Sequence, residues 1–155
     1  DYTFSKCISL TEIKIPGNIR EIGYKSFSGC SGLREISIPS TVKTVGIGAF
    51  ENCTELKDIS LPTTLTEINY YTFSGCTSLT TLTLHSKLTA INNYAFAGCK
   101  SLTEIHCKNS NPPLIGENTF RDVNRIGCKI FVPSKRAKKS YSTALYWNEF
   151  TIYIE

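Results

Sequence analysis

The residues of this sequence with the greatest chemical potential are seven cysteines and two histidines. A catalytic cysteine needs a nearby base and an accessible, electropositive setting, and a zinc site needs Cys or His ligands at short spacing. The sequence has no paired Cys-x-x-Cys, no His-Glu-x-x-His and no glycine-rich phosphate loop. We therefore expect a protein that is not an enzyme and that uses no metal or cofactor.

The cysteines are instead spaced as members of a repeat. Five of them follow one another at intervals of 23 residues: Cys7, Cys30, Cys53, Cys76 and Cys99. The same step relates a column of phenylalanines (Phe4, Phe27, Phe50, Phe73, Phe96) and a column of leucines (Leu10, Leu33, Leu56, Leu79, Leu102). A period of 23 residues falls within the range typical of leucine-rich repeats.

Each repeat contains one short segment in which apolar and polar residues alternate, as in Glu35-Ile36-Ser37-Ile38, and a proline follows it in most repeats. Alternation predicts a strand with one buried face, and no segment within a repeat has the period of a helix. One coil cannot bury its apolar side alone, so coils must stack at about 4.8 Å. We predict a leucine-rich-repeat solenoid, a right-handed stack of short parallel strands and turns, with about five full coils and a partial coil at each end.

The cysteine column permits two interpretations. Stacked coils bring the Cα atoms near the separation that a disulfide needs, but parallel Cβ directions and an odd number of cysteines argue against a disulfide framework. We expect buried, reduced thiols that act as small apolar side chains. Cys107 and Cys128 are the one pair for which a disulfide stays open.

Composition excludes several classes of protein. The chain has 155 residues, a formal charge of +4 and 41% apolar residues, which indicates one domain with a substantial core. We expect no membrane insertion, because no apolar run approaches about 20 residues, and no nucleic-acid binding, because the overall charge is weak. The sequence begins at Asp1 without a signal peptide, so we expect any export signal or lipid anchor to lie outside it.

The repeat also resembles a known family. The string from Phe27 to Phe50, with Phe-Ser-Gly-Cys-Ser-Gly-Leu at its start, is similar to the repeat of BspA-like leucine-rich-repeat surface proteins. The ending, with Cys128-Lys-Ile-Phe-Val-Pro133 and Trp147-Asn-Glu-Phe150, resembles the closing segment of such proteins from gut and oral anaerobic bacteria. The resemblance implies the α/β class, an extracellular or outer-surface location, and adhesion to host-matrix or cell-surface proteins. The sequence departs from the pattern at Cys107 and where His85 and Lys108 replace the proline, so the last repeats are expected to bend or pair differently.

The end of the sequence differs from the repeats. Ile130 and Val132 predict a last inward-facing strand, and Ser134 is a suitable N-cap for a short helix through about Leu145. The apolar side chains that follow are expected to lie over the final coil: Trp147, Phe150 and Ile152. We therefore divide the chain into a solenoid, residues 1–132, and a cap, residues 133–155.

Binding residues must come from the outward positions of the repeats. One outward column of the predicted sheet is mostly acidic, and its candidates are Glu12, Glu35, Asp58 and Glu104. The next column supplies Ser37, Ser60, Thr83 and His106. Stacked carboxylates repel one another, so a basic partner would stabilise them. The alternative is a solvated polar face without a partner.

Two further groups are candidates for binding. The turns before the repeated phenylalanine carry tyrosines, which either anchor an interface or pack on neighbouring coils: Tyr24, Tyr70, Tyr71 and Tyr94. Residues 121–139 carry a net charge of about +6. They would either bind an anionic glycan or form a solvated helix face. The basic residues are Arg121, Arg125, Lys129, Lys135, Arg136, Lys138 and Lys139. We expect a protein-interaction module, with a structural spacer or a glycan binder as alternatives.

Overall fold

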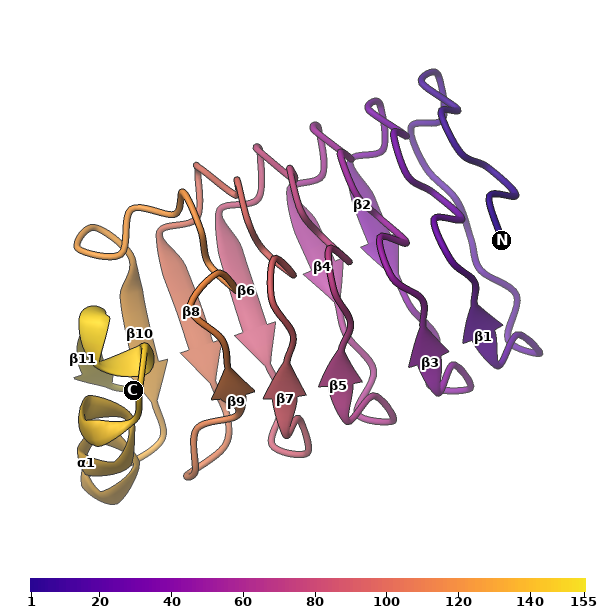
Figure 1. Cartoon of the computed structure of the whole chain (residues 1–155). Coiled ribbons are helices and arrows are strands. Elements are labelled where there is room, and N and C mark those ends of the chain that lie inside the picture. Colours follow the sequence, from indigo (N-terminus) through magenta and orange to yellow (C-terminus); the bar gives the residue numbers. More distant parts are fainter.

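All 155 residues are described by a computed structural model, in which successive coils stack along one axis (Figure 1). Each coil supplies strands to two rows that run in opposite directions (Figure 1). The row called here the main sheet contains β2 (Glu35–Ser37), β4 (Asp58–Ser60), β6 (Thr81–Leu84), β8 (Glu104–Cys107), β10 (Lys129–Val132) and β11 (Thr151–Ile154). The second sheet contains β1 (Glu21–Ile22), β3 (Thr44–Val45), β5 (Glu67–Ile68), β7 (Ala90–Ile91) and β9 (Leu114–Ile115).

All strand pairing is parallel, as the repeat predicts. In the main sheet β2 pairs with β4, and β6, β8, β10 and β11 form one continuous hydrogen-bonded group. Glu35 lies opposite Asp58 and Leu82 lies opposite Ile105. Residues one repeat apart therefore become neighbours in space, and each column of the sequence becomes a row along the solenoid.

Proline sets the length of the strands. β2 and β4 have three residues each, and Pro39 and Pro62 follow soon after their ends. Where His85 and Lys108 replace proline, β6 and β8 have four residues, and the Lys108 N–H donates to the Leu84 carbonyl at 2.8 Å. These repeats were expected to bend or pair differently, and their pairing does differ in length: β6 and β8 pair over four residues, in the same parallel register in which β2 and β4 pair over three. The longer pairing follows from the loss of proline, because proline has no N–H to donate.

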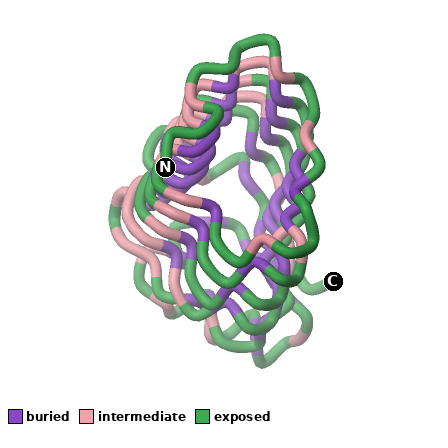
Figure 2. Tube along the Cα trace, turned by 90° about the vertical axis from the view of Figure 1, so that its right-hand side faces the viewer, coloured by how far each residue is buried: buried purple, intermediate pink, exposed green.

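The repeated apolar residues line the inside of every coil (Figure 2). The six phenylalanines of the ladder stack nearly parallel, with ring centroids 5.2–5.6 Å apart: Phe4, Phe27, Phe50, Phe73, Phe96 and Phe120. Their backbone joins the coils as well, since the Phe50 N–H donates to the Thr72 carbonyl at 2.8 Å. The ladder is therefore held both by ring packing and by hydrogen bonds between coils.

The five cysteines of the column are free thiols, as expected, and Cys107 and Cys128, for which a disulfide was left open, are free as well. Four ladder thiols reach a phenylalanine carbonyl of the preceding coil at 3.0–3.4 Å: Cys30, Cys53, Cys76 and Cys99. Burial raises the pKa of Cys53 and of Cys99 to about 12. Cys7 corrects the expectation of uniform burial, because it is exposed on the first coil, where only one side is covered by a neighbour.

The segment after Pro133 closes the stack beyond β10 (Figure 1). The helix α1 (Lys135–Thr143) begins as predicted, with the Ser134 hydroxyl accepting from the Ala137 N–H at 3.1 Å, but it ends before the predicted Leu145, which is 70% exposed. Trp147 lies in a short 3₁₀ turn, packs against Phe120 and donates from its indole N–H to the Pro113 carbonyl at 2.7 Å. No helix of the protein has the length and apolar character to cross a lipid bilayer.

The last strand, β11, is a finding that the sequence reasoning missed. Ile152 was expected only to lie over the final coil, whereas residues Thr151–Ile154 form a full strand that pairs with β10 along its length. The alternation of Thr151, Ile152 and Tyr153 is the signal that predicts such a strand. The main sheet therefore extends one strand into the closing segment.

The phenylalanine ladder predicts a graded effect of truncation. We expect Phe73→Ala to lower the free energy of unfolding by about 3–5 kcal/mol, because the ring is buried between two others. Phe4→Ala is the matched control: its ring is 37% exposed and stacks on one side only, so the loss should be clearly smaller. Urea unfolding followed by circular dichroism measures both, and equal losses would contradict the proposed role of stacking.

The thiols predict a second pattern. In the folded protein a thiol reagent should react quickly with Cys7 alone, because the other six cysteines are buried. After unfolding in urea, seven thiols should react, with or without prior reduction. A count below seven in unreduced protein would show that a disulfide forms.

Candidate functional site

The outward side chains of the main sheet form a surface called here the sheet face. Strand pairing places the predicted acidic and hydroxyl columns side by side on it, since Glu35 lies opposite Asp58 and Ser37 lies opposite Ser60. The same alternation that buries Ile36 and Ile59 turns these four polar side chains to solvent. The structure therefore brings together the predicted candidates of both columns.

The N-terminal half of the sheet face is hollowed. A groove of about 720 Å³ lies over the first coils and is lined by the three carboxylates of Glu12, Glu35 and Asp58, by Lys14, and by the hydroxyls of Ser37 and Ser60. None of the three carboxylates takes part in an ion pair. An open groove with unpaired negative charge can accept a cationic side chain.

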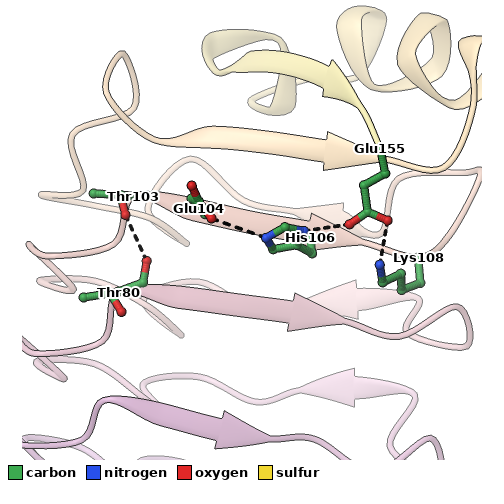
Figure 3. Close-up of polar contacts among 6 residues, drawn as sticks. All are labelled: Thr80, Thr103, Glu104, His106, Lys108 and Glu155. Atoms are coloured by element: carbon green, nitrogen blue, oxygen red, sulfur yellow. Dashed lines mark hydrogen bonds and ion pairs between the residues drawn. The ribbon is translucent and has the colours of Figure 1, made fainter.

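The C-terminal half of the sheet face is occupied by the protein's own charges (Figure 3). His106 on β8 lies between two carboxylates: its Nδ1 is 2.6 Å from Glu155 Oε1, and its Nε2 is 3.5 Å from Glu104 Oε2. Lys108 Nζ donates to the other oxygen of Glu155 at 2.6 Å. Hydrogen bonds from Lys108 and then from His106 lower the pKa of the Glu155 carboxyl. Glu104 and His106 are thus engaged within the protein, unlike Glu35 and Asp58.

An aromatic row adjoins this charged network. The His106 ring stacks on Phe131 of β10 at 4.8 Å, and Phe131 packs against Tyr153 of β11 at 5.7 Å. Phe131, Tyr153 and Glu155 did not appear among the predicted site residues. Tyr153 and Glu155 reach the sheet face only because β11 joins the main sheet, whereas Phe131, between the predicted inward residues Ile130 and Val132, could have been found from the alternation of that strand. Thr83, the remaining predicted hydroxyl, lies opposite His106 on β6.

The tyrosines lie elsewhere, in the turns that follow strands of the second sheet. Tyr24 follows β1 and packs edge-on against Tyr2, with ring centroids 5.3 Å apart. Tyr71 and Tyr94 stack at 4.9 Å, and Tyr70 beside them is 44% exposed. Tyr71 and Tyr94 therefore pack on each other between coils, Tyr24 packs on Tyr2, and none of the predicted tyrosines shares a surface with the sheet face.

Two of these tyrosines adopt an unfavourable backbone conformation. Tyr71 and Tyr94 have φ values of 59° and 63°, in the left-handed region, at the repeat position where Gly48 has 62°. A residue with a side chain pays about 1–2 kcal/mol for this conformation, whereas glycine does not. The backbone of both tyrosines thus has a conformation that glycine adopts most easily.

The structure separates the predicted basic cluster into parts. Arg125 is engaged, since it pairs with Glu149 and donates to the Glu117 carbonyl at 2.8 Å. Lys129 lies on β10 opposite Glu104, and Arg121 is exposed next to Asp122. The remaining four cations are exposed on α1: Lys135, Arg136, Lys138 and Lys139.

The histidines and cysteines do not gather into a site. His85 is buried, its Nδ1 accepts the Lys87 N–H at 3.3 Å, and burial lowers its pKa. Cys107 lies inside the solenoid, where burial raises its pKa to about 12. No group of three or more His, Cys, Asp or Glu side chains is arranged to hold a metal ion.

The Glu155 contacts predict a pH-dependent effect. A carboxyl with a lowered pKa adds stability above the ordinary glutamate range, and the contribution is lost as the pH falls through the lowered pKa. Glu155→Gln should therefore lower the Tm at pH 7 by at most about 4 °C, as expected for exposed pairs, and by less at pH 3. Thermal melts of this variant and of the control Glu55→Gln, an exposed carboxyl without an ion pair, measure the difference. A loss that is the same at pH 3 and pH 7 would show that the pairs contribute nothing.

Three solved structures are similar to this chain. A leucine rich cell surface protein from Faecalibacterium prausnitzii A2-165 is 30% identical, has a TM-score of 0.73 and matches 85% of this chain. The pneumococcal vaccine antigen PcpA is 22% identical over 94% of the chain with a TM-score of 0.62, and a leucine-rich repeat protein from Bacteroides ovatus ATCC 8483 is 21% identical over all of it with a TM-score of 0.51. The last two likenesses show the fold alone. The chain spans 35%, 41% and 57% of the lengths of these proteins, in that order.

A comparison with curated protein sequences found no match. The family model described as the BspA type leucine rich repeat region matches residues 1–131 with six copies. Those residues hold the phenylalanine ladder, the cysteine column and every strand of the second sheet. The stacked parallel strands, the 23-residue period and this match agree, and the chain belongs to the family of BspA-type leucine-rich-repeat proteins.

Proposed function

We propose that this chain is a non-enzymatic protein-interaction module of a bacterial cell-surface protein, and that it binds a host or extracellular-matrix protein through the N-terminal half of its sheet face. The observation that carries the proposal is the groove with three unpaired carboxylates from adjacent coils. The location outside the cell rests on likeness to the cell surface protein of Faecalibacterium prausnitzii, which contains a similar solenoid.

Charge in the groove favours a basic partner. Glu35 and Asp58 are direct neighbours across β2 and β4, and Glu12 lines the same groove from the first coil. Like charges that face each other on neighbouring strands cost about 0.2–1 kcal/mol per pair. A lysine or arginine of a partner would relieve this repulsion, and Ser37 and Ser60 would supply hydroxyls for further hydrogen bonds.

The difference between the two halves of the sheet face supports the choice of the N-terminal half. The carboxylates of Glu104 and Glu155 already have His106 and Lys108 as partners. A ligand would have to displace these contacts, whereas the groove presents free carboxylates. Glu104, Thr83 and His106 therefore belong to the rim of the proposed interface, and the aromatic row of Phe131 and Tyr153 adjoins them.

The tyrosine turns are a second contact area in the proposal. Exposed tyrosines bury a large area for little loss of rotamer entropy. Since these turns lie beside the second sheet, a partner would contact them only by wrapping around the coil or by binding there separately.

Binding of the whole chain to a panel of extracellular-matrix proteins at physiological salt tests the proposal. We expect the double variant Glu35→Lys with Asp58→Lys to lose binding at least tenfold with an unchanged melt, because it reverses the charge of the groove. The matched control is Glu21→Lys with Glu67→Lys, which reverses two exposed carboxylates of the second sheet.

The outcomes separate the alternatives. Equal loss in both double variants would contradict a specific site on the sheet face, since net charge alone would then explain it. Loss only on changing Tyr70→Ser and Tyr71→Gly would place the interface on the tyrosine turns. An absence of binding by the unaltered chain would favour a structural spacer.

A further inference from the structure

The helix α1 carries the whole formal net charge of the protein. The chain has 17 basic and 13 acidic side chains, and four of the basic ones lie within residues 135–139. Without these four, the numbers of basic and acidic side chains are equal. The positive charge is therefore local to the closing segment, far along the solenoid from the acidic groove (Figure 1).

These four side chains form one face of the helix, called here the α1 basic face: Lys135, Arg136, Lys138 and Lys139. The helix is attached through Ala137 and Tyr141, which are both completely buried. At about 100° per residue, Lys139 points away from these two residues, Lys135 and Arg136 lie within about 60° of that direction, and Lys138 lies at the edge of the face; all four are exposed. The α1 basic face is thus turned fully to solvent.

The cations of this face form no ion pairs, and their position lowers the stability of the helix. No carboxylate forms an ion pair with any of them, and the first turn of α1 contains no acidic residue. Positive charge at the N-terminal half of a helix opposes the helix dipole, and like charges three or four residues apart repel. Arg125 shows the contrast, because it is held by Glu149 and by a carbonyl.

The composition of the surroundings discriminates among anionic partners. The α1 basic face has no exposed aromatic ring on which a nucleic-acid base could stack, since Tyr141 is buried. The apolar side of the helix is buried in the protein, and a single exposed Leu145 adjoins it, which is too little apolar surface for insertion into a lipid interface.

We propose that the α1 basic face binds a linear sulfated polysaccharide. The interaction is electrostatic, with several sulfates along the chain contacting the four side chains in turn, and it is separate from the proposed protein interface on the sheet face. The positive end of the helix dipole adds to the attraction. Because the two surfaces lie on different parts of the solenoid, a matrix protein and a polysaccharide can occupy the protein together.

Fluorescence anisotropy of a labelled heparin oligosaccharide, titrated with the whole chain at physiological salt, tests the proposal. Neutralising the face (Lys135→Gln, Arg136→Gln, Lys138→Gln, Lys139→Gln) should weaken binding at least tenfold and flatten the dependence of log Kd on log salt. The matched control also removes three lysines and one arginine, all exposed and without ion pairs: Arg20→Gln, Lys43→Gln, Lys57→Gln and Lys87→Gln. It should change Kd less than twofold, and both variants should keep the melt of the unaltered chain.

Several results would overturn the proposal. Equal weakening in the two variants would show that binding follows net charge and has no site. Double-stranded DNA or phosphatidylserine vesicles that bind more tightly than heparin would assign the face to another class of partner. The groove variant with Glu35→Lys and Asp58→Lys should bind heparin at least as well as the unaltered chain. The polysaccharide proposal can therefore hold even if the protein-interaction proposal fails.

Discussion

Stacking of one coil on the next is the constraint on which the rest of this structure depends. A 23-residue coil has too little interior to bury its own apolar side chains, so each column becomes a core only when neighbouring coils align. Alignment of the coils produces three kinds of contact: phenylalanine rings with centroids 5.2–5.6 Å apart, thiols that contact carbonyls of the preceding coil, and parallel strand pairs. Inward positions are therefore almost invariant along the chain, whereas outward positions are free to differ.

The same constraint explains the closing segment. A stack that ended at β10 would leave Phe120 and the last coil open, and Trp147 and Phe150 cover that ring while α1 and β11 continue the structure. Adding β11 to the main sheet places Tyr153 against Phe131 and brings Glu155 to His106 and Lys108, where its carboxylate pairs with both. Closure of the core and the character of the outer surface are thus decided by one strand.

Because the outward residues differ from coil to coil, the two ends of the molecule carry charge of opposite sign. Unpaired carboxylates line the groove over the first coils, and unpaired cations cover α1 on the closing segment. Between them, the acidic and basic groups around His106 satisfy each other. Clusters of like charge without partners form the surfaces proposed for binding, and the paired charges around His106 link the last strands.

The sequence by itself determined the repeat, the class of fold, the inward columns and the free thiols of the cysteine column, because a strict 23-residue period places the same residue type at the same point of every coil. It also identified Ser134 as the start of the closing helix, since capping is a local interaction. Only the tertiary structure decided that β11 joins the main sheet, that Arg125 is paired while the α1 cations are not, and that Glu104 and His106 are engaged but Glu35 and Asp58 are open. These outcomes depend on residues that are distant in sequence and unrelated by the repeat, such as Glu155 and His106, and no periodic pattern relates them.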